Sequence, residues 1–146
     1  MLSVMLPVTG NGRRCAVKPE LHLTKAAHFA ATAARLDPIK DYEAIMWAGM
    51  HSCTHWTNAI FHAKGLTDVE FDFEHSWHID RCPDTDRVLA GLDGQLGGLL
   101  DALAVFEGLR TGYVRGPGPF GPEALAQSQE ALERVRAVAK DVFGEL

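Results

Sequence analysis

Three histidines, His51, His55 and His62, have types and spacings that could support chemistry. Two imidazoles four residues apart on a helix can bind one transition-metal ion through their neutral nitrogens. His62 lies about 10 Å from this pair on the same helix face, which is too far to share that ion. The metal hypothesis therefore takes His51, His55 and a third ligand from a later segment. The candidates for that ligand are Asp72, Glu74, His75, His78 and Cys82.

A structural interpretation explains the same histidines without a metal ion. They belong to a polar band about 80° wide on one side of a long predicted helix. Buried histidines are usually satisfied by backbone groups or carboxylates, so a covering segment or a second subunit would account for this face. If neither covers it, the face is a candidate ligand site. Its residues are Trp47, His51, His55, Asn58 and His62.

Arg110, Tyr113 and Arg115 form a second candidate group, near the end of a later predicted helix. Together they could bind an anion, which adds Arg110 and Tyr113 to the candidate ligand-binding residues. The arginines would equally stabilise the C-terminal end of that helix by offsetting its dipole.

Two predicted helices near the start of the chain must position the histidine row. Thr24 can cap a first helix over Lys25–Leu36, which ends before Pro38. The second helix runs from Asp41 to a terminating glycine, Gly65. A stripe with helical periodicity marks its buried face. The stripe contains Tyr42, Ile45, Met46, Cys53, Trp56, Ile60 and Ala63.

Two further helices complete the predicted up-down four-helix bundle. One runs from Asp84 or Thr85 to about Gly112, and the other begins at Pro122 after a Gly/Pro connector. Glycines at 91, 94, 97 and 98 interrupt the first of these helices. Such glycines allow close approach of another backbone or mark a kink, and we favour tight packing on a neighbouring helix or a dimer mate.

Two stretches are not expected to be helical. Residues 69–79 alternate between apolar or aromatic and polar side chains, which predicts an extended segment with one buried face. This segment is our first candidate to cover the histidine row. Residues 2–8 and 13–18 flank a turn signal, so they form either a short hairpin or a loosely ordered tail.

Length and composition indicate one soluble domain over residues 1–146. The formal net charge of −5 gives no strong signal for nucleic-acid binding. Three cysteines without a C-x-x-C pair favour free thiols in a reducing cytoplasm over the alternative of one intermolecular disulfide. The N-terminus lacks the basic region of a signal peptide, and no apolar run reaches membrane-spanning length, so no membrane association is expected.

The helix pattern resembles the HEPN-like helical-bundle superfamily. The segment HLTKAAHFAATAARLDPIKDYEAIMWAGMHSCTHWTNAIFHAKGL is similar to the opening helical hairpin of that family. The segment LDALAVFEGLRTGYVRG, followed by a Gly/Pro loop and a final helix, is similar to its "L..LR...dY" region and fourth helix. Arg110 and Tyr113 match the structural part of that pattern.

The resemblance implies a homodimer that acts as a ribonuclease, as a partner of a nucleotidyltransferase or as a binding module. The ribonuclease branch carries an Arg and a polar residue followed by a His after four to six residues, and no Arg here precedes a His at that spacing. The expectation is therefore a non-catalytic binding module without a cofactor, with a nucleotide- or RNA-related ligand. The alternative is a metal-binding protein or metal-dependent enzyme that holds a divalent transition metal through His51, His55 and His78.

Overall fold

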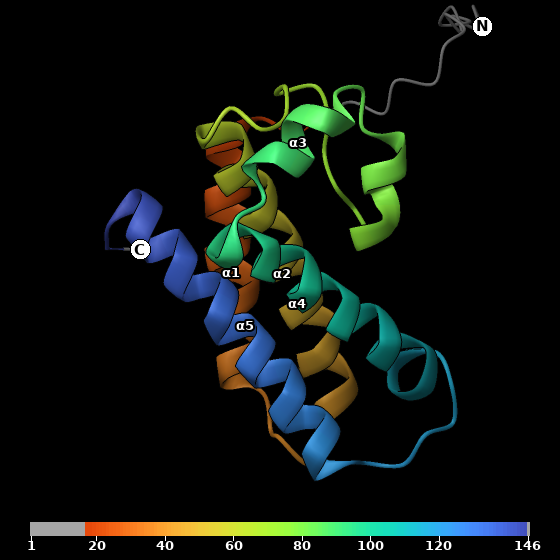
Figure 1. Ribbon diagram of the computed structural model, residues 1–146. Coiled ribbons are helices and arrows are strands. Elements are labelled where there is room, and N and C mark those ends of the chain that lie inside the picture. The colour runs from red at the N-terminus through yellow and green to blue at the C-terminus, as the bar shows by residue number, and fades with distance from the viewer. Residues whose placement is uncertain (1–16, 146) are drawn as a thin grey trace, which may run out of the picture.

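The computed structural model describes residues 17–145, and all regular secondary structure in that range is helical. The predicted all-α helical bundle is confirmed. Its central helix, α2, packs against α1, α4 and α5 (Figure 1). Of the predicted N-terminal hairpin, residues 1–16 lie outside the described range. The elements are α1 (Pro19–Arg35), α2 (Tyr42–Ala63), the 3₁₀-helix η1 (Ser76–Arg81), α3 (Thr85–Gly91), α4 (Gly94–Leu109), the π-helical turn η2 (Arg110–Val114) and α5 (Pro122–Phe143).

The hydrophobic core forms around the apolar face of α2. The middle of the predicted stripe is buried, with Trp56 and Ile60 in one cluster and Met46 in a second. Tyr42 is only half-buried and Ala63 is exposed, because these residues begin and end the helix. The apolar side of α2 therefore needs no explanation beyond bundle packing.

Helix α1 begins earlier than predicted. Pro19 occupies its first position, where the missing N–H costs nothing, and Glu20 in the first turn favours the helix dipole. Thr24, the expected cap, lies inside the helix and donates a hydrogen bond from Oγ1 to the Glu20 carbonyl at 3.3 Å. The longer helix brings His22 onto the buried side of α1, in line with Ala26.

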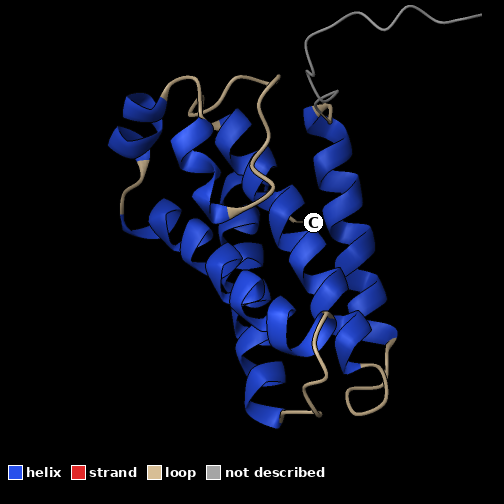
Figure 2. Cartoon of the chain, turned by 90° about the vertical axis from the view of Figure 1, so that its right-hand side faces the viewer, coloured by secondary structure: helices blue, strands red, loops and turns tan. Residues whose placement is uncertain are grey.

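The predicted extended segment 69–79 is instead irregular: residues 69–70 lie in a turn, residues 71–73 have no regular structure, and η1 begins at Ser76. Phe73 is buried as the alternation predicts, but Trp77 is 48% exposed because the chain turns into η1 at Ser76. The carboxylate of Glu107 accepts hydrogen bonds from the backbone N–H and the hydroxyl of Ser76, at 2.6 and 2.7 Å. This cap comes from a distant helix, so no local pattern indicates it. Figure 2 shows the irregular connections in tan and the helices in blue.

The third predicted helix is broken into α3 and α4, which meet at a bend of 113°. A Cβ atom at Gly91 would lie 2.1 Å from Cδ2 of Leu66, so any larger residue there would require the Leu66 side chain to move. A Cβ atom at Gly94 or Gly97 would meet nothing within 4 Å. Within residues 17–145 no single helix is long and apolar enough to cross a membrane, although this bent pair passes that test of length and composition when taken together.

Candidate functional site

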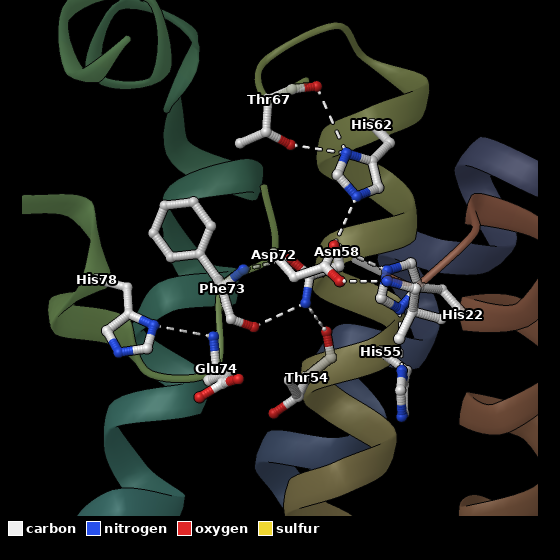
Figure 3. Close-up of polar contacts among 11 residues, drawn as sticks. His22, Thr54, His55, Asn58, His62, Thr67, Asp72, Phe73, Glu74 and His78 are labelled. Carbon is white, nitrogen blue, oxygen red and sulfur yellow. Dashed lines mark hydrogen bonds and ion pairs between the residues drawn. The ribbon is translucent and has the colours of Figure 1, made fainter. Parts of the chain in front are cut away.

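Three metal-capable side chains converge beside the C-terminal half of α2. Nε2 of His22 and Nε2 of His62 lie 3.0 and 2.9 Å from the same oxygen, Oδ1 of Asp72. The ligand atoms of all three residues lie within 4.8 Å of one another. Figure 3 shows that the two imidazoles reach Asp72 from different helices, α1 and α2. We call this group the His22–His62–Asp72 cluster.

The His22–His62–Asp72 cluster is nearly enclosed by protein. The side chains of His22 and His62 are each 1% exposed, and that of Asp72 is 17% exposed. A buried imidazole needs partners for both ring nitrogens. The sequence alone does not suggest this arrangement, because it joins residues 50 and 10 positions apart in the chain.

The second nitrogen of each histidine also has a partner. Nδ1 of His22 lies 2.9 Å from Nδ1 of His55, and Nδ1 of His62 lies 2.9 Å from the hydroxyl of Thr67. The other carboxylate oxygen of Asp72 accepts the backbone N–H of Val17 at 2.9 Å. Metal-binding histidines usually have such a partner on the remote nitrogen, which fixes the ring orientation and the tautomer.

The charge state of the cluster follows from these contacts. Partial burial opposes ionisation of Asp72, but hydrogen bonds from His22, His62 and the Val17 backbone outweigh it and hold the pKa of the carboxyl below its usual range. Burial, with the neighbouring His22 and Lys25, lowers the pKa of His55 to about 4. At neutral pH the cluster therefore has an ionised carboxylate beside a neutral His55.

Asn58 holds the segment that carries Asp72 against α2. Its side-chain amide donates to the Phe73 carbonyl and its oxygen accepts the Phe73 N–H, both at 2.7 Å. The same amide donates to the Thr54 carbonyl at 3.0 Å. All atoms of this two-way contact are buried, so it fixes the register of residues 71–73 and directs Asp72 to the histidines (Figure 3).

Two elements cover the predicted histidine face of α2. Asp72 and Phe73, which lie in the segment before η1, cover His62 and Asn58, as we expected for residues 69–79. Phe29 of α1 stacks on His51 and His55, with ring centroids 5.2 and 6.0 Å apart. Contacts within this chain therefore cover part of the histidine face.

A pocket of about 900 Å³ lies beside the cluster, between α2, the segment before η1 and the turn η2. This volume lies in the range of small-molecule sites, and both His22 and Asp72 line it. Of the predicted site residues, it is lined by Trp47, His51, His55, Asn58, His78 and Arg110, whereas His62 and Tyr113 do not line it.

The structure does not bring the predicted metal ligands His51, His55 and His78 into one group. In residues 17–145, the two groups able to hold a metal ion include neither His51 nor His55. His55 instead contacts His22, one of the candidate ligands. His78 belongs to the second group, whose ligand atoms also lie within 4.8 Å of one another and which we call the Glu74–His75–His78 cluster.

Asp72 was among the expected third ligands, but His22 was missed. The signal for His22 was present in Pro19, which is typical of the first position of a helix. A helix from Pro19 places His22 and Ala26 one turn apart on the same face. The contact between His22 and Asp72 depends on tertiary structure and has no local signal.

Comparisons of the chain with protein-family models, curated proteins and solved structures find no match. The HEPN-like resemblance therefore stays a prediction.

Proposed function

We propose that this protein binds a divalent transition-metal ion through Nε2 of His22, Nε2 of His62 and the carboxylate of Asp72. The observation that carries the proposal is the convergence of these three ligand atoms within 4.8 Å. Two imidazoles and one carboxylate suit Zn²⁺, Fe²⁺ or Mn²⁺ better than Ca²⁺ or Mg²⁺, which prefer oxygen ligands alone.

Three protein ligands leave at least one coordination position for water or a ligand. Sites that hold a metal ion only for structure usually have four protein ligands, whereas catalytic sites keep a position open. Because His22 and Asp72 also line the large pocket, the open position would face a space that a small molecule can enter. A metal ion there would lower the pKa of bound water and supply a nucleophile near neutral pH.

Metal analysis of protein purified without a histidine tag tests the proposal. We expect about one equivalent of a transition metal in the wild-type protein, and loss of it in His22→Gln, His62→Gln and Asp72→Asn. His28→Gln serves as the matched control, because His28 is exposed on α1 and belongs to neither metal-capable group. Substoichiometric metal in wild type after incubation with Zn²⁺, Fe²⁺ or Mn²⁺ would contradict the proposal.

A second proposal follows the family resemblance, namely a homodimeric, cytoplasmic binding module with a nucleotidyltransferase partner or a nucleotide- or RNA-related ligand. Its support is the helical hairpin of α1 and α2 together with the open space at Gly94 and Gly97, where another subunit has room to pack. Buried free thiols at Cys53 and Cys82 suit a reducing compartment. Light scattering tests the dimer, and a monomer at micromolar concentration would contradict it.

A further inference from the structure

We infer that Arg110 and Arg115 form an anion-binding subsite, and that the pocket takes a small organic anion with an apolar body. Both arginines line the 900 Å³ pocket. Within residues 17–145 neither forms an ion pair with a carboxylate, in contrast to Arg87, which pairs with Asp68 and Asp84. The inference depends on the proposed function only in placing this anion and a metal ion in one pocket.

The turn η2 is the local structure that brings the two arginines together. The backbone N–H of Arg115 donates to the carbonyl of Arg110 at 2.9 Å, which is the i to i+5 bond of a π-helical turn. In a regular α-helix, residues five positions apart point about 140° away from each other. The wider turn reduces this angle, so both guanidinium groups can face the pocket.

The charges that line the pocket favour an anion once a metal ion is bound. Its arginines, Arg81, Arg110 and Arg115, balance its carboxylates, Glu70, Asp72 and Glu74. A divalent ion at Asp72 would therefore make the total formal charge of the lining positive. Arg81 already lies over the Trp77 ring, 4.7 Å from its centroid, which leaves Arg110 and Arg115 as the cations to bind the ligand.

The remaining lining residues indicate the body of the ligand. Carboxylates and phosphates both match the fork of a guanidinium group, so either group suits the anionic end of the ligand. Part of the pocket lining is an apolar wall. That wall suits an aromatic or aliphatic body rather than a bare inorganic ion. It consists of Trp47, Met50, Phe71, Phe73 and Val114.

Calorimetric titration tests the subsite with three probes of similar shape, namely phenyl phosphate, benzoate and neutral benzyl alcohol. Each is titrated into chelator-treated and into zinc-loaded protein. We expect at least one anion to bind roughly tenfold or more tightly than benzyl alcohol, since hydrogen bonds to charged groups are stronger than neutral ones. The preference between phenyl phosphate and benzoate identifies the type of anion.

Three variants locate the binding. Arg110→Gln and Arg115→Gln should each weaken anion binding roughly tenfold while melting as wild type does. Arg35→Gln, an exposed arginine in the last turn of α1, should bind as wild type does. Equal binding of all three probes, or wild-type affinity in both Arg110→Gln and Arg115→Gln, would overturn the subsite.

The zinc-loaded and chelator-treated arms separate this inference from the proposed function. Loss of anion binding in the arginine variants without metal supports the subsite even if zinc never binds, in which case the metal proposal alone fails. Stoichiometric zinc with no arginine-dependent anion binding overturns the subsite alone.

Discussion

The His22–His62–Asp72 and Glu74–His75–His78 clusters border the same pocket but differ in where their protons can lie. In the first, the remote nitrogens of the histidines contact His55 and Thr67, each of which can donate or accept. In the second, Nδ1 of His78 accepts the backbone N–H of Glu74 at 3.2 Å, and that group can only donate. Neutral His78 therefore keeps its proton on Nε2.

Proximity of three metal-capable side chains is therefore not sufficient for a metal site. A histidine ligates through an unprotonated nitrogen, so its other nitrogen must be able to carry the proton. His22 and His62 meet this condition with their existing partners. For His78 to bind a metal ion through Nε2, its proton would have to move to Nδ1, which requires the contact with the Glu74 backbone N–H to break. The first cluster is therefore the better candidate for the proposed metal ion.

Removing the Asp72 carboxylate should change Zn²⁺ affinity more than any other substitution considered, whereas removing the Glu74 carboxylate should change it little. Asp72→Asn should weaken Zn²⁺ binding by more than about 100-fold, because even the outer partners of metal ligands are worth about 10–100-fold. Glu74→Gln should change the affinity by less than about threefold, since Glu74 belongs to the second cluster. Competition with a fluorescent chelator measures both constants. The reverse order of effects would move the metal ion to the second cluster.

Stability should respond next most strongly at Asn58. Asn58→Ala leaves the buried N–H and C=O of Phe73 without their partner, which should lower the free energy of unfolding by about 2–3 kcal/mol. Ser76→Ala removes one hydroxyl contact to Glu107 near the second cluster and should cost about 1 kcal/mol. Urea unfolding of metal-free protein compares them. An equal or larger cost at Ser76 would show that the Asn58 contact does not hold the segment.

A smaller effect on metal affinity is expected at His55, a positioning residue that acts through His22. His55→Phe keeps a ring against Phe29 but removes the contact with Nδ1 of His22, and should weaken Zn²⁺ binding about 10-fold. His51→Phe, one turn away with the same stacking partner, should leave the affinity unchanged. Equal losses in the two variants would indicate a general packing effect.

The pH dependence of stability should be the mildest signature. Because burial lowers the pKa of His55 to about 4, the unfolded chain binds more protons between about pH 4 and 6.5, and stability should rise with pH through that range. Partial solvent exposure reduces the expected gain to about 1 kcal/mol. Because the pKa of Asp72 is lowered in the folded protein, stability should also fall as the pH drops below about 4. Urea midpoints of wild type and His55→Phe measure this, and an equally steep rise in the variant would refute the assignment to His55.

Periodicity predicted the long helices well, because burial of one face is a local, repeating signal. The stripe of α2 and the proline at the start of α5 both identified real elements. Thr24 misplaced the start of α1, since a threonine that bonds the carbonyl four residues earlier resembles a cap in sequence. That single boundary concealed His22.

The site was predictable only in part, because its contacts join distant segments. The polar face of α2 supplied Asn58 and His62, and the segment after it was correctly expected to cover them. The prediction that His51 and His55 bind one metal ion came from their spacing alone. In the structure, His55 instead contacts His22 of α1. Local pattern cannot indicate which side chain another helix presents.

Anomalous X-ray diffraction at the zinc edge, from crystals of untagged protein grown with Zn²⁺, tests the metal assignment most directly. We expect one strong peak about 2.0–2.2 Å from Nε2 of His22, Nε2 of His62 and an oxygen of Asp72. A peak only at Glu74, His75 and His78, or no ordered peak at either cluster, would contradict it.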